Sequence, residues 1–144
     1  MSPIKERFMS TLMFSQSGIR GVVGDSLTPE LVQKVSMAFG RFNGKGPVVV
    51  GGDTRTSHDA YKHLVIGALC AVGTDVIDIG KVTTPTVQQM IREHNAAGGI
   101  VVTASHNPII WNGLKLMNDT GSFLNKREYE SFIDLYEEEA PPLA

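Results

Sequence analysis

The sequence has a single cysteine, Cys70, among its 144 residues, which excludes a disulfide bond within the chain. Cys70 follows Ala68 and Leu69 in an apolar stretch, so we expect a buried and unreactive thiol. No apolar run approaches the roughly 20 residues that a membrane-spanning helix needs. The charged residues near the N-terminus are not followed by the apolar core of a secretory signal. We therefore expect a cytoplasmic protein with no membrane partner.

Concentrated positive charge is also absent. The formal net charge is −2, with 13 Lys and Arg residues scattered against 15 Asp and Glu residues, so we expect no nucleic-acid partner. The glycine-rich loops that bind nucleotide phosphates are missing, and so is the Gly-x-Ser-x-Gly turn of serine hydrolases. The remaining composition, 42% hydrophobic and 19% charged, is typical of a globular domain with one core.

Short apolar segments alternate with amphipathic ones along most of the chain. Strands are expected at 47–50, 75–79, 98–102 and 114–117. The expected helix starts are Thr28-Pro29, Ser57, Thr84-Pro85 and Asn125, the last with Glu128 as in a capping box. Residues 14–24, with three glycines, are interpreted as backbone that either turns sharply or lies close to a ligand. This alternation predicts an α/β fold, a three-layer α/β/α domain whose mainly parallel, four-stranded mixed sheet is covered by helices on both faces.

One domain is expected, at residues 14–139. Residues 1–13 are interpreted as a lead segment. The pair Pro141-Pro142 suggests that 140–144 begins an interdomain linker.

Three polar, glycine-containing segments need a common explanation: 17–21, 51–57, and 103–108 with its extension 112–115. Two of them follow the carboxyl ends of expected parallel strands, which meet at one edge of such a sheet. Arg55, Ser105 and His106 should therefore lie near one another. Glycine amides, arginine guanidinium groups and the Lys115 ammonium are all donors suited to an anion. A phosphate group is the natural ligand for such a set.

These segments resemble the first domain of the α-D-phosphohexomutases. The resemblance rests on Ser-Gly-Ile-Arg-Gly at 17–21, Gly-Asp-Thr-Arg-Thr-Ser at 52–57, Thr-Ala-Ser-His-Asn-Pro at 103–108 and Asn-Gly-Leu-Lys at 112–115. It implies that Ser105 carries a phosphate that is passed to the substrate. The catalytic residues it implies are Ser105, His106, Lys115 and Arg20. The phosphate-binding residues it implies are Ser17, Gly18, Arg20, Arg55, Asn107 and Lys115, with Arg55 also supporting the serine loop.

The resemblance further implies a reaction, a cofactor and missing partners. Hexose 1-phosphate and hexose 6-phosphate would interconvert through a bisphosphorylated sugar. Mg²⁺ would be held by the phosphoserine oxygen of Ser105 and by an aspartate-rich loop of a second domain. The family enzyme has four domains and this sequence resembles the first, so we expect the chain alone to be inactive. Ser15-Gln16 departs from the glycine and threonine of many members.

Simpler interpretations stand beside these. Ser105 could have the purely structural role of capping a turn, and Arg20 or Arg55 could have the purely structural role of holding loops together. Asp53 is interpreted as a turn or capping residue in preference to a metal ligand. Trp111 either covers the loop edge or contacts a sugar. The histidines outside the motif, His58, His63 and His94, are expected to be solvated. The competing function is a phosphate or phosphosugar binding module in which Ser105 is never phosphorylated.

Overall fold

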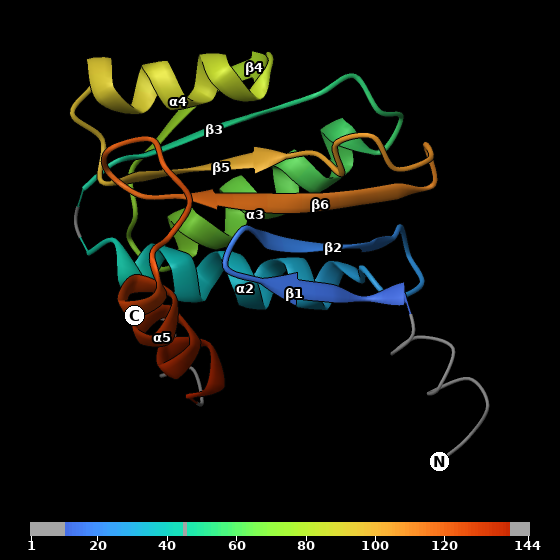
Figure 1. Ribbon diagram of the computed structural model, residues 1–144, viewed down its shortest axis with the longest axis horizontal. Coiled ribbons are helices and arrows are strands. Elements are labelled where there is room, and N and C mark those ends of the chain that lie inside the picture. Colours follow the sequence, from blue (N-terminus) through green and yellow to red (C-terminus); the bar gives the residue numbers. More distant parts are fainter. Residues whose placement is uncertain (1–10, 45, 139–144) are drawn as a thin grey trace.

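The computed structural model describes residues 11–44 and 46–138. The strands are β1 (Met13–Ser15), β2 (Gly18–Val22), β3 (Val48–Gly52), β4 (Val76–Lys81), β5 (Gly98–Val102) and β6 (Trp111–Met117). The helices are α2 (Pro29–Phe42), α3 (His58–Ala71), α4 (Thr84–Glu93) and α5 (Lys126–Glu137). Helices lie on both sides of one sheet, which confirms the three-layer α/β/α prediction (Figure 1). Most of the lead segment expected at 1–13 and the linker expected at 140–144 lie outside the described residues.

The prediction of a mainly parallel sheet of four strands is wrong in the number of strands and in the share of parallel pairs. The sheet has six strands in the order β1-β2-β6-β5-β3-β4. Only the β5-β3 and β3-β4 pairs are parallel, whereas β1-β2, β2-β6 and β6-β5 are antiparallel. The missed strands β1 and β2 form a hairpin within residues interpreted as turning backbone. Their three and five residues are too short for a periodic signal, and pairing with β6, about 90 residues away in sequence, stabilises them.

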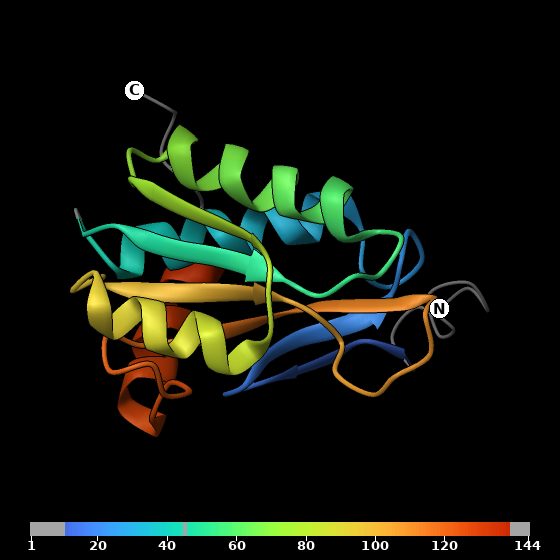
Figure 2. The ribbon, with the colours of Figure 1, turned by 90° about the horizontal axis from the view of Figure 1, so that it is seen from above.

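Two hydrophobic cores flank the sheet. The larger lies under α2, α3 and α5 and includes Phe39, Phe132 and Leu114, all fully or almost fully buried. The smaller lies under α4, where Val87 and Ile91 pack with Val49, Val101 and Met117 of the sheet. Figure 2 shows α4 over β3 and β5, while no described helix covers β1, β2 and the start of β6 on that face. The sheet thus keeps an open area beside α4.

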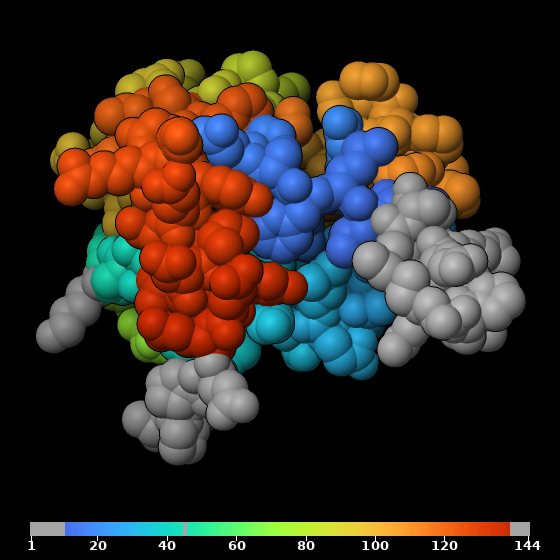
Figure 3. Space-filling model, turned by 60° about the horizontal axis from the view of Figure 1, so that its bottom comes forward, coloured from blue at the N-terminus to red at the C-terminus, as the bar shows by residue number. Residues whose placement is uncertain are grey.

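Helix α5 packs beside the β1-β2 hairpin and closes the larger core. The ring of Phe14 in β1 lies 5.3 Å from that of Tyr136 and 6.4 Å from that of Phe132, measured between centroids. Figure 3 shows the red surface of α5 against the blue surface of the hairpin. A helix that follows the whole sheet in sequence therefore holds the first strands in place.

The four expected helix starts are confirmed, but only two of the expected caps form side-chain hydrogen bonds. The Thr28 side chain accepts a hydrogen bond from the Leu31 amide, and Asn125 and Glu128 form the predicted capping box. Ser57 is the N-cap residue of α3 as predicted, whereas Thr84, predicted as a cap, is the first residue of α4. Ser57 makes no capping hydrogen bond, and α4 has Thr83 as its N-cap, also without a side-chain bond. Ser57 instead accepts from the Asn112 side chain, 2.7 Å away, because β6 lies beside the start of α3.

Two residues of α3 are buried differently from expectation. Cys70 is exposed, because the face of α3 that meets the core is formed by Tyr61, Val65, Ala68 and Leu69. His58 is fully buried, whereas His63 and His94 are exposed as predicted. Within residues 11–44 and 46–138, no helix combines the length and the hydropathy that crossing a bilayer requires.

Candidate functional site

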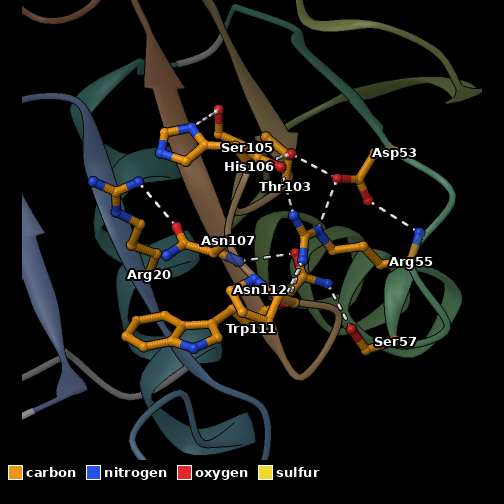
Figure 4. A network of polar contacts seen from close by, with 12 residues as sticks. Arg20, Asp53, Arg55, Ser57, Thr103, Ser105, His106, Asn107, Trp111 and Asn112 are labelled. Carbon is orange, nitrogen blue, oxygen red and sulfur yellow. Dashed lines mark hydrogen bonds and ion pairs between the residues drawn. The ribbon is translucent and has the colours of Figure 1, made fainter.

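The Ser105 loop connects β5 to β6 and begins where β5 leaves the sheet. Ser105 has a φ of +57°, in the left-handed region that a non-glycine residue seldom adopts. Its amide donates to the hydroxyl of Thr103 at 3.0 Å, and the Asn107 amide donates to the Ala104 carbonyl at 3.1 Å. This tight turn holds the Ser105 side chain exposed at the end of a buried strand (Figure 4). Backbone held in a sparsely populated region often marks a functional residue.

Arg55 holds this loop from the neighbouring strand end. Its guanidinium donates to the carbonyl oxygens of Ser105 at 2.6 Å, Pro108 at 2.7 Å and Trp111 at 3.1 Å. Its Nε pairs with Asp53 at 3.0 Å, and only 10% of the side chain is exposed. The planar group thus spans both ends of the loop, a geometry that lysine cannot reproduce. These contacts occupy Nε, Nη1 and Nη2 of Arg55 with protein oxygens.

Asp53 joins the two strand ends. Its carboxylate accepts from the Arg55 amide at 3.1 Å, as in an Asx turn, and from the Thr103 hydroxyl at 2.7 Å. Thr103 in turn accepts from the Ser105 amide. A continuous chain of hydrogen bonds therefore runs from the β3 loop to the Ser105 backbone. Sequence reasoning identified Asp53 as a turn residue but missed this bridge, since it depends on parallel pairing of β3 and β5.

His106 lies next to the serine hydroxyl. Its Nδ1 atom is 3.4 Å from Ser105 Oγ, a long contact between exposed groups. Arg20 Nη1, from strand β2, donates to the Asn107 side-chain oxygen at 3.1 Å. Figure 4 shows the Arg20 guanidinium, the His106 ring and the Ser105 hydroxyl on the same side of the loop. Arg20 therefore links the hairpin to the serine loop.

The open part of the sheet next to α4 carries a cavity of about 230 Å³ beside Ser105. Its lining includes five of the residues proposed from sequence: Ser17, Gly18, Arg20, Ser105 and Lys115. The same cavity is lined by Met13, Ser15, Ile19, Thr103, Ala104, Leu114 and Phe123. Arg55 and Asn107 instead line a separate shallow depression with Asp53, Thr54 and Ile109. The structure thus separates residues that face the cavity from residues that support its rim.

Strand register explains the hollow. Gly18 of β2 pairs with Ser15 of β1 on one side and with Lys115 of β6 on the other, so these three residues form a row across the sheet. The next row on the same face joins Met13, Arg20 and Gly113. Each row has one glycine, which leaves space between longer side chains.

The backbone around position 18 also requires a glycine there. It has a φ of +121°, and a Cβ atom there would overlap the carbonyl oxygen of Leu114. Any side chain at this position would push β2 away from β6 and would also fill the floor of the cavity.

Positive charge dominates the cavity lining. Among the residues that the structure describes, Arg20 and Lys115 are the cationic side chains of the lining, and no Asp or Glu belongs to it. The Lys115 ammonium lies 6.0 Å from the centroid of the half-exposed Phe123 ring, at the outer limit of a cation–π contact. Phe123 had no signal in the sequence, because it reaches the site only through its bridge to Met117. Hydroxyls and cations without carboxylates are suited to a phosphate group.

A complete metal site is not formed by the part of the chain that the structure describes. Residues 11–44 and 46–138 contain no group of three His, Cys, Asp or Glu side chains placed to hold a metal ion. The Asp53 carboxylate is engaged by Arg55 and Thr103. Trp111 lies beside the loop with its side chain partly buried, and its carbonyl is one of the oxygens held by Arg55.

Comparison with known proteins gives a consistent result. The family model for the phosphoglucomutase/phosphomannomutase α/β/α domain I matches residues 11–142. A "probable phosphoglucosamine mutase" of Pyrococcus furiosus is 44% identical over 126 residues, covering 88% of this chain and 28% of that protein. A phosphoglucomutase/phosphomannomutase of Thermococcus kodakarensis is 42% identical over 127 residues, covering 85% of this chain and 28% of that protein.

The fold agrees with solved structures. The crystal structure of a "putative phosphomannomutase" from Thermus thermophilus superposes with a TM-score of 0.81 at 36% identity, over 92% of this chain and 31% of that one. The chain thus spans less than a third of the length of the relatives it matches. It belongs to the phosphoglucomutase/phosphomannomutase family of phosphohexomutases, where it corresponds to the α/β/α domain I.

Proposed function

We propose that this chain is the phosphoserine-carrying domain of a phosphohexomutase that interconverts hexose 1-phosphates and hexose 6-phosphates. The observation that carries the proposal is the position of Ser105. Its hydroxyl is exposed on a turn held by Arg55, at the edge of a cavity where Arg20 and Lys115 are the charged side chains among the described residues. A phosphate on Ser105 would add about −1.5 to −2 charges at neutral pH, next to those two cations.

Transfer from phosphoserine needs positioning and charge stabilisation more than covalent help from the protein. A sugar hydroxyl attacks the phosphorus, the bond from phosphorus to Ser105 Oγ breaks, and the attacking oxygen loses its proton. The product is a bisphosphorylated sugar. After that sugar turns over, its other phosphate moves to Ser105 Oγ and regenerates the phosphoserine. The phosphate count is therefore unchanged after one cycle.

The residues in and around the cavity divide the work of this scheme. Arg20 and Lys115 stabilise the charge that spreads over the three phosphoryl oxygens during transfer. His106, next to the Ser105 hydroxyl, or Lys115 takes the proton of the attacking sugar hydroxyl. Arg20 is unsuited to that step because a guanidinium group hardly deprotonates. Ser17 and Gly18 form the cavity wall beside the cations, and Asn107 orients Arg20.

Arg55 acts through the loop instead of touching the ligand. Its donors are directed at three loop carbonyls and at Asp53, so it fixes where the phosphate on Ser105 points. Mg²⁺ would neutralise further charge at the phosphate. In this chain the ligand available to Mg²⁺ is the phosphate on Ser105, because Asp53 is occupied, and further oxygen ligands would come from another domain. We infer that the chain alone does not turn over substrate.

Intact-mass measurement and peptide mapping of the protein from cells test the proposal. A fraction of the protein is expected to carry one extra phosphate on the peptide that contains Ser105. Phosphate on Ser17 or Ser57 instead would overturn the assignment. Absence of phosphate in all preparations would favour the second candidate, a phosphosugar binding module. Mixing the chain with glucose 1-phosphate, glucose 1,6-bisphosphate and Mg²⁺ tests the inactivity of the isolated domain, which measurable isomerisation would refute.

A further inference from the structure

Ser15 is a polar residue of the cavity to which the family resemblance gives no role. It stands at the C-terminal end of the short edge strand β1. Its side chain is exposed and lines the cavity together with Arg20, Ser105 and Lys115. Ser15 thus places a hydroxyl in the cavity from the strand most distant from β5 on this side of the sheet.

The Ser15 hydroxyl is paired with that of Ser17. The two Oγ atoms are 2.9 Å apart, and one of them donates to the other. One hydrogen serves that bond, so the second hydroxyl keeps its own hydrogen to donate to a ligand. A hydroxyl in such a chain is polarised by its neighbour and becomes a better donor. The pair therefore offers one directed donor to the cavity.

The row formed by Ser15, Gly18 and Lys115 provides the space for an anion. Neighbouring strands are about 4.8 Å apart, so the backbones at Ser15 and Lys115 are separated by about 10 Å with glycine between them. The flexible Lys115 side chain can reach into this space from one side, and the serine pair faces it from the other. Arg20 lies two residues from Gly18 on the same face of β2. Three kinds of donor thus surround one small hollow.

We propose that Ser15 is an additional phosphate-binding residue. Its hydroxyl, paired with Ser17, binds a phosphate group that is held between Lys115 and Arg20 on the open sheet. This inference rests on the proposed function for the identity of the natural ligand, a phosphosugar, while the binding itself can be measured with inorganic phosphate.

Titration of the protein with inorganic phosphate tests the inference. Binding is followed through the amide resonances of Gly18 and Lys115 in NMR spectra, with glucose 1-phosphate as a second probe. The variants are Ser15→Ala, which removes the hydroxyl, and Ser15→Thr, which keeps it. Ser131→Ala is the matched control, because Ser131 is also exposed but lies on α5 outside the cavity. Thermal unfolding of each variant checks that the fold is intact.

Ser15→Ala is expected to raise the dissociation constant for phosphate roughly three- to tenfold, the effect of losing one typical hydrogen bond at an exposed site. The dissociation constants of Ser15→Thr and Ser131→Ala for phosphate should stay within about twofold of that of the unmodified protein. Equal binding by Ser15→Ala and the unmodified protein would overturn the inference, as would an equal loss in Ser131→Ala. Phosphate that fails to shift the Gly18 and Lys115 resonances at all would also overturn it.

The outcome is independent of the test of the proposed function. If Ser105 is phosphorylated in cells and Ser15→Ala binds normally, the mutase proposal stands and the role of Ser15 is refuted. If Ser105 is never phosphorylated and Ser15→Ala binds phosphate weakly, the role of Ser15 stands on a binding module.

Discussion

Replacing Arg55 by methionine removes the group that holds both ends of the Ser105 loop while keeping a long side chain. The change deletes donors to three carbonyl oxygens and leaves the Asp53 carboxylate, 32% exposed, without its cationic partner. A hydrogen bond from a charged donor contributes about 1.5–3 kcal/mol, but water can replace part of it at exposed loop carbonyls. We therefore expect the free energy of unfolding to fall by about 2–3 kcal/mol.

Urea denaturation measures this loss, and hydrogen exchange locates it. For a domain of this size, the melting temperature should fall by roughly 5–10 °C. Exchange should accelerate at the Ser105 and Asn107 amides, which donate within the loop, before it changes in α2. The free energy of unfolding of Arg55→Lys should lie between those of the unmodified protein and Arg55→Met, because an ammonium keeps the charge but cannot span three carbonyls.

Arg127→Met is the control, since Arg127 is exposed on α5, away from the loop. It should change the free energy of unfolding by less than about 0.5 kcal/mol. Asp53→Asn combined with Arg55→Met should recover part of the loss, because it removes the unpaired carboxylate. A loss for Arg55→Met no larger than for Arg127→Met, with unchanged exchange in the loop, would refute the role of Arg55.

Three further perturbations test other parts of the structure. Tyr61→Phe removes a buried hydroxyl that donates to the Leu27 carbonyl at 2.6 Å and accepts from the Gly24 amide at 3.1 Å. In urea denaturation, the free energy of unfolding should fall by about 1–3 kcal/mol. An unchanged free energy of unfolding would mean that water satisfies both backbone groups. Burial, and secondly the nearby Lys62 charge, lowers the pKa of His58, so on acidification the unfolded chain binds a proton at a higher pH than the folded one. The free energy of unfolding should therefore fall as the pH drops below about 6.5, by at most about 1.4 kcal/mol per pH unit. His58→Leu should reduce this dependence of stability on pH. Gly18→Ala forces a methyl group against the Leu114 carbonyl at a positive φ and should cost about 2–4 kcal/mol in thermal and urea unfolding, whereas an unchanged stability would contradict the close approach of β2 and β6.

Local patterns in the sequence determined the elements and the motif residues. The apolar segments that became β3, β4 and β5 were found within a few residues of their ends. The capping residues Thr28 and Asn125 were identified because the chemistry of a cap involves only neighbours in the chain. The motif segments also suggested which residues meet a phosphate, and Arg20, Ser105 and Lys115 do line one cavity.

Contacts between segments distant in sequence determine the features that local patterns missed. The β1-β2 hairpin is short and rich in glycine, so it carries no period, and its stability comes from β6 and from the packing of Phe14 on α5. The same pairing places Ser15 and Phe123 in the cavity. The burial of His58 follows from the packing of α3 on the end of β3, where a Cβ on Gly52 would be 2.6 Å from its Nδ1 atom.

The sequence by itself thus determined where the four helices and the strands β3 to β6 form and which loops carry donors, because those signals act over a few residues. The order of the strands, the open face beside α4 and the separation of Arg55 from the cavity came only from the tertiary structure. They depend largely on contacts between residues about 50 to 120 positions apart, whose free energies no local pattern encodes.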